Sequence, residues 1–278
     1  MQQSGTKCEF YSSDSWVILS PIEQSIKRKI EAVGTPLKDW DIQINYGIKT
    51  GYNDAFIIDT AKRDEILANC QSEDERERTA ELIRPILRGR DIKRYGYNWA
   101  GLYLIATFPS RHYDIEQYPA VKEYLLSFGI ERLEQTGKEH NVNGEKIKAR
   151  KKTSNKWFET QDSISYWEDF YKPKLFYADI TQRLNFCICN EVMFCNNTTY
   201  FIATKSEETL EYLYKYLNSP IADWYYRTKS VQLGEKAVRM FSIYMLEIPI
   251  PPMIKDIETY KLLGLTPTEV AFIEDREY

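Results

Sequence analysis

The chain has 278 residues, of which 43% are hydrophobic and 14% aromatic, so it can bury the core of one large domain or of two small ones. No apolar run approaches the roughly 20 residues of a membrane span, and residues 1–10 lack the basic-then-apolar pattern of a secretory signal. The formal net charge of −4 excludes a protein that is basic over its whole surface. We therefore expect a soluble cytoplasmic protein with no membrane partner.

The first predicted element is a helix over residues 21–33. Ser20 and Glu23 form a capping-box pattern in front of it, and a proline occupies the first helical position. Residues 41–46 then alternate in polarity and residues 55–59 are apolar, with a turn-rich segment between them. This pattern predicts a hairpin with a long exposed loop.

A second capping pair, Ser72 with Glu75, begins a charged helix that should end near residue 84, because Pro85 disfavours helical geometry before it. Residues 102–108 are a strand candidate. Residues 119–133 have the periodicity of one amphipathic helix.

The stretch from residue 136 to residue 156 is polar, lacks apolar periodicity and is strongly basic. It holds seven Lys or Arg residues against two Glu, a net charge of +5, and residues 84–94 carry five against one Asp, a net charge of +4. Long unstructured stretches inside a compact domain are typically functional or act as linkers. We predict a basic loop or arm at 136–156, although each charge run alone could equally be a solvated surface.

The remaining elements are a β-rich block and a helical pair. Strands are predicted over residues 174–180, 186–189, 192–195 and 199–203, followed by helices over 207–217 and 221–229 and an extended piece over 241–252. Strands and helices without regular alternation predict an α+β fold with mixed, largely antiparallel sheets and packed helices. We divide the chain into an N-terminal extension (1–17), one recognition domain (18–252) that contains the basic loop, and an acidic C-terminal tail (253–278) with six acids against three bases in its last 24 residues.

The chain contains five cysteines, and three of them (Cys187, Cys189 and Cys195) fall on one probable hairpin. Their spacing matches no zinc site, so we interpret them as reduced thiols.

Motifs of DNA-modifying catalysis are missing from the sequence. An adenine methyltransferase carries an Asn/Asp-Pro-Pro-aromatic motif and a Gly-rich cofactor turn, whereas Pro251-Pro252 here follows Ile250 and the glycines are scattered. Asp91-Ile92-Lys93 has the form of a magnesium nuclease motif, but the arginines around it would oppose metal binding. His112 and His140 are the only histidines, and both have the polar surroundings of ordinary surface residues.

Several segments, in their order and spacing, resemble the TaqI-like C-terminal specificity domain of type IIG restriction-modification enzymes and related adenine-specific DNA methyltransferases. The segments are INYGIKTGYNDAFIID (44–59), IRPILRGRDI (83–92), WE (167–168), KPKL (172–175), TTYFI (198–202), LNS (217–219) and WYYR (224–227). The resemblance extends from about residue 18 to residue 252. It implies a module that reads double-stranded DNA in the major groove, beside a methyltransferase domain in the same polypeptide or in a partner subunit.

The resemblance also implies that catalysis lies outside this segment. No cofactor is expected in the segment itself, whereas the parent enzyme would use S-adenosylmethionine, and Mg²⁺ if it cleaves DNA. The expected parent is an adenine-N6 methyltransferase with or without an endonuclease.

The candidate DNA-binding residues come from family motifs and from the divergent basic segment. Lys49, Thr50 and Asn53 match the family loop, which read from its residues alone is either a tight structural loop or an anion-binding loop. Arg84, Arg88 and Arg90 match the family turn. Positions shared by modules that read different sequences should be scaffold or phosphate contacts, so we expect base and phosphate contacts chiefly from the divergent positions Lys146, Lys148, Arg150, Lys151, Lys152, Lys156, Gln182 and Arg183.

Two alternatives remain open. The aromatic stripe Tyr212, Tyr216, Trp224 and Tyr225 could dock another subunit of a multi-subunit restriction system, although such a stripe is more often core. The Asp91 motif could belong to a metal-dependent nuclease.

Overall fold

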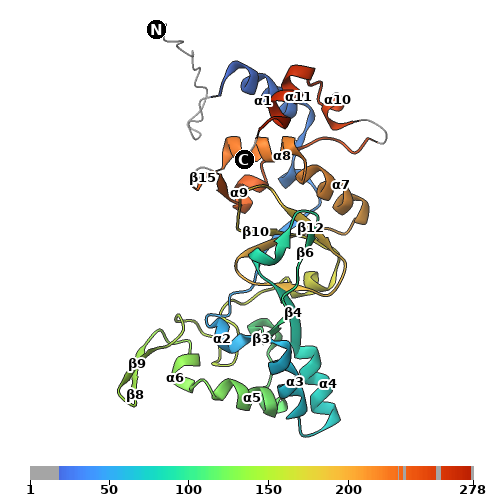
Figure 1. Ribbon diagram of the computed structural model, residues 1–278. Helices are drawn as coiled ribbons and strands as arrows, with labels where there is room; N and C mark the ends of the chain where they lie inside the picture. The colour runs from blue at the N-terminus through green and yellow to red at the C-terminus, as the bar shows by residue number, and fades with distance from the viewer. Residues whose placement is uncertain (1–18, 231, 234–235, 255–257, 277–278) are drawn as a thin grey trace.

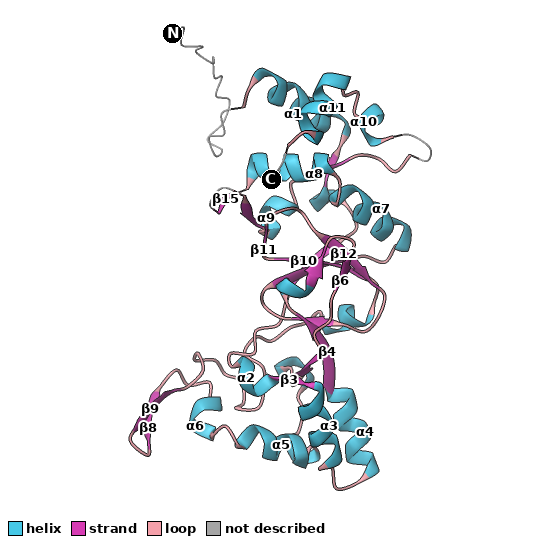
Figure 2. Cartoon of the chain, in the orientation of Figure 1, coloured by secondary structure: helices cyan, strands magenta, loops and turns pink. Residues whose placement is uncertain are grey.

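The computed structural model describes residues 19–230, 232–233, 236–254 and 258–276. The N-terminal extension predicted at 1–17, with Cys8, lies outside the described residues. The molecule is elongated: helices gather at both ends, and most of the strands lie between them (Figure 1, Figure 2). No helix in the described part of the chain combines the length and the apolar character that a membrane crossing requires.

A four-stranded sheet of order β12-β10-β14-β2 forms the middle of the molecule. Its strands are β2 (Gln43–Tyr46), β10 (Lys174–Ala178), β12 (Phe186–Cys189) and β14 (Thr199–Ala203), and all of their pairings are antiparallel. Side chains alternate between the two faces of a strand. Leu175 and Tyr177 accordingly enter one hydrophobic core, whereas Phe176 enters the other. The sheet is therefore a shared wall between two cores.

The first core lies at the end of the molecule that carries α3, α4 and α5 (Figure 1). It surrounds a sheet of order β13-β4-β7-β3, in which only the β13–β4 pair is parallel. Its elements are α2 (Asn53–Phe56), β3 (Ile57–Asp59), α3 (Thr60–Ala68), α4 (Glu73–Leu82), β4 (Ile83–Leu87), β7 (Leu102–Ile105), η3 (Pro109–Arg111), η4 (Ile115–Gln117), α5 (Pro119–Leu126), α6 (Ile130–Leu133), η5 (Trp167–Tyr171) and β13 (Phe194–Cys195).

The second core lies at the opposite end, where helices from both ends of the described chain pack together. Its elements are α1 (Pro21–Val33), β1 (Thr35–Pro36), η1 (Leu37–Asp39), β11 (Ile180–Thr181), α7 (Glu207–Leu217), α8 (Pro220–Lys229), β15 (Gln232–Leu233), β16 (Ala237–Arg239), α9 (Ser242–Met245), β17 (Pro249–Ile250), α10 (Thr259–Leu262) and α11 (Pro267–Glu274). Strand β1 pairs with β17, and β16 lies between β11 and β15.

The helices with strong capping signals form as the sequence predicts. Ser20 and Glu23 make the reciprocal capping box of α1, and the Ser72 side chain accepts from the Glu75 N–H at the start of α4. The mixed α+β fold with largely antiparallel sheets is confirmed.

Several sequence predictions about strand pairing and about helix positions are wrong. Strands β2 and β3 do not form a hairpin, because β2 pairs with β14 and β3 with β7. Strands β12 and β13 likewise belong to different sheets. The helix predicted over 119–133 is broken at Gly129, whose φ of 83° is outside the helical range. The extended piece at 241–252 begins instead with helix α9.

The segment predicted as a C-terminal acidic tail folds into α10 and α11 and packs on the second core. The Glu269 carboxylate accepts hydrogen bonds from Lys29 Nζ and Ser25 Oγ, both at 2.7 Å, and from the Thr266 backbone N–H, also at 2.7 Å. Burial alone would raise its pKa, but these hydrogen bonds outweigh burial and hold the pKa at about 2. This carboxylate therefore ties the C-terminal helix to α1.

Protonation of Glu269 at low pH should weaken the contact between the C-terminal helix and α1. Because the folded-state pKa of Glu269 is depressed, its stabilisation is present above the ordinary value of 4.5 and is lost as the pH falls towards 2. We expect Glu269→Gln to lower the free energy of unfolding by about 2 to 3 kcal/mol at pH 7 and by much less near pH 2. Urea unfolding of both proteins from pH 7 to pH 2 measures this; a difference that does not change with pH would contradict it.

Candidate nucleic-acid interface

The basic stretch predicted as a loop or arm is a β-hairpin. Strands β8 (Glu139–Val142) and β9 (Glu145–Lys148) pair antiparallel, and Asn143 and Gly144 form the turn with φ values of 52° and 88°. Positive φ at both central residues defines a type I′ turn, for which Asn-Gly is the favoured pair. The hairpin extends from one end of the molecule (Figure 1, Figure 2), and we call residues 138–152 the ribbon.

The two faces of the ribbon differ in chemistry. Asn141 lies opposite Lys146 and Glu139 opposite Lys148 on one face, while His140 and Val142 lie opposite Ile147 and Glu145 on the other. Side chains directly opposite each other share a face of the hairpin. The first face is polar and all four of its residues are exposed, whereas His140, Val142 and Ile147 are half-buried.

The lysines predicted to bind DNA remain on the surface. Lys146, Lys148, Lys151, Lys152 and Lys156 are all exposed. A cation that keeps its water contact can exchange it for a phosphate oxygen at little desolvation cost.

The prediction that Arg150 contacts DNA is corrected by the structure, because this residue is buried and only 4% exposed. Its guanidinium donates four hydrogen bonds to backbone carbonyls, those of Leu133 (2.8 Å), Thr50 (2.7 Å), Glu159 (2.8 Å) and Trp157 (2.6 Å). Burial lowers its pKa to about 10, which still leaves it charged at neutral pH. Arg150 is therefore a structural cation that joins the base of the ribbon to three other segments.

One of these segments is the family loop, which lines a polar hollow of about 270 Å³. Its lining residues are Lys49, Thr50, Gly51, Asn53, Gln161 and Asn197. The fold thus brings the three predicted loop residues together with two amide side chains that sequence reasoning missed. Nothing local in the sequence marks Gln161 or Asn197, because only the tertiary fold places them there.

The Thr50 side chain shapes the loop. It is 1% exposed, its hydroxyl donates to Asn53 Oδ1 (2.7 Å), and it accepts from the Tyr52 N–H (3.1 Å). Gly51 has a φ of 78°, and a Cβ there would lie 2.8 Å from Gln161 Oε1. The loop is therefore held in one shape around the hollow.

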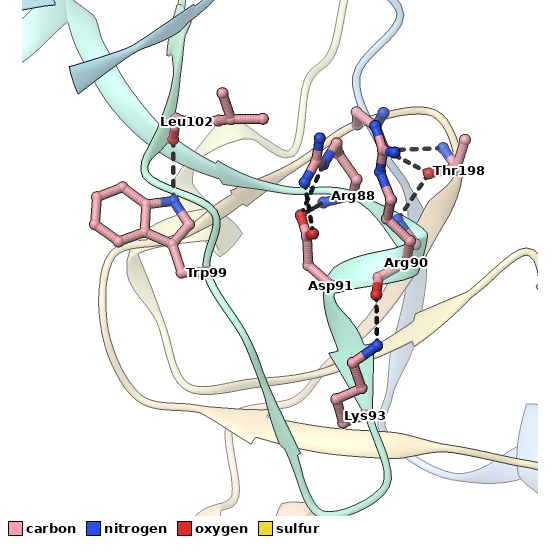
Figure 3. Close-up of polar contacts among 9 residues, drawn as sticks. Arg88, Arg90, Asp91, Lys93, Trp99, Leu102 and Thr198 are labelled. Atoms are coloured by element: carbon pink, nitrogen blue, oxygen red, sulfur yellow. Dashed lines mark hydrogen bonds and ion pairs between the residues drawn. The ribbon is translucent and has the colours of Figure 1, made fainter. Parts of the chain in front are cut away.

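The family turn lies where β4 ends, and Figure 3 shows its polar contacts. Asp91 accepts from Arg88 at three points: the backbone N–H (2.9 Å), Nε (3.0 Å) and Nη2 (2.8 Å). Lys93 Nζ donates to the Arg90 carbonyl at 2.9 Å. Arg84 is half-buried with its guanidinium 5.4 Å from the centre of the Tyr171 ring, whereas Arg90 is exposed. Only Arg90 of the three predicted arginines presents an open side chain.

This geometry disfavours the metal-nuclease alternative. Burial alone would raise the pKa of Asp91, but its bonds to Arg88 outweigh burial and lower the pKa. Its carboxylate is engaged by Arg88, and no cluster of three or more metal-ligating side chains occurs within the described ranges. Asp91 acts as the cap of the turn η2 (Gly89–Asp91), which leads into the pair β5 (Ile92–Lys93) and β6 (Gly96–Tyr97).

Removing this carboxylate should weaken the turn. Asp91→Ala leaves the Arg88 guanidinium without its partner, so we expect the free energy of unfolding to fall by about 2 kcal/mol. Lys93→Ala is the matched control, since its ammonium is exposed and bonds a single carbonyl. Thermal unfolding of both variants measures the effect; equal stability of the two would show that Asp91 is not structural.

Gln182 and Arg183 lie in the second half of the molecule, directly after β11, and both are exposed. Arg227 donates to the Gln182 carbonyl, which fixes the backbone of this turn. Figure 2 shows β11 beside α9, in the half of the molecule that does not carry the ribbon. The structure therefore does not bring these two residues next to the ribbon.

The aromatic stripe proposed as a docking face belongs to the second core. Trp224, Tyr225 and Tyr216 are 0%, 2% and 3% exposed, and Tyr212 is half-buried against them.

The cysteines that the structure describes, Cys70, Cys187, Cys189 and Cys195, are free thiols.

Solved structures of other proteins are similar to this architecture. The structure is similar to that of the type IIG restriction endonuclease BpuSI, with a TM-score of 0.51 and 13% identity over 92% of this chain and 28% of that one. A second similar structure is the type IIL restriction-modification enzyme MmeI in complex with DNA, with a TM-score of 0.47 and 14% identity over 86% of this chain and 27% of that one. At this identity the BpuSI match shows a shared fold. The chain spans little more than a quarter of either enzyme. No curated protein matches the sequence.

The class of the protein follows from a family model. The family model of the TaqI-like C-terminal specificity domain matches residues 84–250, more than half of the 278-residue chain. The chain belongs to the TaqI-like C-terminal specificity domain family. Its function is DNA target recognition.

Proposed function

We propose that the ribbon reads the DNA target sequence in the major groove. The observation that carries this proposal is the exposed two-stranded hairpin, which bears Lys146 and Lys148 on one polar face although the whole chain has a net charge of −4. The major groove of B-DNA admits a two-stranded β-ribbon, whereas the minor groove is about half as wide. A basic element on an acidic body also orients the protein, because the remaining surface is repelled by phosphate.

Each exposed side chain of the ribbon has a role in this arrangement. The Asn141 amide can donate to N7 and accept from N6 of adenine, and Lys146 beside it can donate to guanine O6 and N7. Lys148, Lys151, Lys152 and Lys156 bind phosphates on either side of the groove. Arg90, Gln182 and Arg183 form further contacts where the duplex passes the rest of the molecule.

The chemistry belongs to a part of the polypeptide, or a partner subunit, beyond these 278 residues. A parent adenine-N6 methyltransferase would supply the S-adenosylmethionine site, and an attached endonuclease would supply the Mg²⁺ site. Two observations support this division: the sequence lacks the Asn/Asp-Pro-Pro-aromatic motif, and the chain spans 28% of the BpuSI enzyme.

Selection from a pool of random duplexes tests the proposal. The full chain is immobilised, bound duplexes are recovered and sequenced, and the selection is repeated with a chain in which Asn141, Lys146 and Lys148 are alanine. We expect the first chain to enrich one short sequence and the second to lose that preference. An identical enriched sequence from both chains would show that the ribbon does not read bases.

A further inference from the structure

The family loop that lines the hollow carries three consecutive backbone N–H groups. The backbone N–H groups of Lys49, Thr50 and Gly51 make no hydrogen bond to any residue that the structure describes. Gly51 is exposed and Lys49 is half-buried, whereas Thr50 is 1% exposed, so a ligand from outside can approach the first two residues. A backbone N–H without an acceptor is one that a bound acceptor can pair.

Positive charge surrounds these N–H groups. Lys49 lines the hollow, and its ammonium lies 4.7 Å from the centre of the Tyr46 ring. Beneath the loop, the Arg150 guanidinium donates to the Thr50 carbonyl at 2.7 Å. That carbonyl and the Gly51 N–H belong to the same peptide group, so the bond polarises the N–H towards a stronger donor. Consecutive N–H groups of a turn, together with a cation, are the elements of an anion site.

One group opposes an anion here. An Asp162 carboxylate oxygen lies 3.8 Å from Lys49 Nζ, and both side chains are about 40% exposed. An ion pair this exposed is weak, so Lys49 can leave Asp162 for a phosphate at small cost.

We propose that this hollow binds one phosphodiester of the DNA backbone and so fixes the height of the ribbon along the duplex. The proposal rests on the proposed function. Arg150 follows β9 by two residues and holds both the loop and the ribbon base, so a phosphate in the hollow is in rigid register with the ribbon. The N–H groups of Lys49 and Gly51, together with the Lys49 ammonium, bind the phosphate oxygens, with Asn53, Gln161 and Asn197 at the border of the site.

The first test uses inorganic phosphate as the probe. In amide NMR spectra of the full chain, we expect titration with phosphate to move the N–H signals of Lys49, Thr50 and Gly51 together. Lys49→Gln should weaken this response several-fold and Asp162→Asn should strengthen it. Lys38→Gln is the matched control, because Lys38 is an exposed lysine paired with Glu247 at 2.9 Å in the other half of the molecule. Absence of any phosphate response at the three signals would overturn the proposal.

The second test asks whether the phosphate belongs to DNA. For the duplex selected above, a plot of log affinity against log salt should lose about one unit of slope in Lys49→Gln and none in Lys38→Gln. An unchanged slope in Lys49→Gln would overturn this assignment while leaving ribbon recognition intact. Failure of the unaltered chain to bind any duplex would overturn both proposals.

Discussion

Replacing four ribbon lysines with glutamine is expected to lower duplex affinity by about three orders of magnitude at about 0.15 M salt. The four are Lys146, Lys148, Lys151 and Lys152, all exposed. Lys148, Lys151 and Lys152 each make a phosphate contact worth about 0.9 in the slope of log affinity against log salt, so their loss removes about 2.7. Loss of the Lys146 base contact lowers the affinity by about one further order of magnitude. Fluorescence anisotropy with a labelled duplex across a salt series gives both quantities.

A chain with the same change of net charge is the control for this loss. Lys38, Lys205, Lys215 and Lys261 are exposed lysines outside the ribbon and the hollow. Their replacement with glutamine should change affinity only several-fold, through the weaker long-range attraction of the whole protein. Equal losses in the two variants would show that net charge, and not the ribbon, determines binding.

Arg150→Met is expected to have the largest effect on stability, a loss of about 3 to 5 kcal/mol in the free energy of unfolding. Methionine fills much of the volume but leaves four backbone carbonyls without the donors they have in the folded protein. Urea unfolding at pH 7 measures the loss. Lys151→Met, at the adjacent exposed position, should cost less than about 0.5 kcal/mol.

Two outcomes separate the causes of that loss. Arg150→Lys keeps a buried cation but cannot reach four carbonyls, so we expect it to fall between wild type and Arg150→Met. A loss below about 1 kcal/mol in Arg150→Met would contradict the structural role of this residue, and would return it to the set of possible DNA contacts.

Local signals in the sequence predict local structure well. Ser20 and Ser72 cap helices where expected, because an N-cap acts within one turn of its own position. The type I′ turn at Asn143-Gly144 was missed although its signal is local. An Asn-Gly pair between two short segments is a strong hairpin signal, whereas the charge density of this segment is also typical of a loop.

Sheet pairing and burial depend on partners far away in the sequence. Strand β2 pairs with β14, more than 150 residues later, and nothing in residues 43–46 specifies that partner. Arg150 stands in a run of three basic residues, and only it turns inward, because the carbonyls that bind it come from residues 50, 133, 157 and 159. The loop residues were therefore identified by resemblance, but the hollow that they form with Gln161 and Asn197 was not.

Chemical footprinting with dimethyl sulfate tests the central claim most directly. The reagent methylates N7 of guanine, which lies in the major groove, and N3 of adenine, which lies in the minor groove. With the duplex selected by the full chain, we expect protection of guanine N7 within the target and loss of that protection when residues 139–148 are replaced by a short Gly-Ser linker. Protection confined to adenine N3, or guanine protection that survives removal of the ribbon, would contradict major-groove reading by this hairpin.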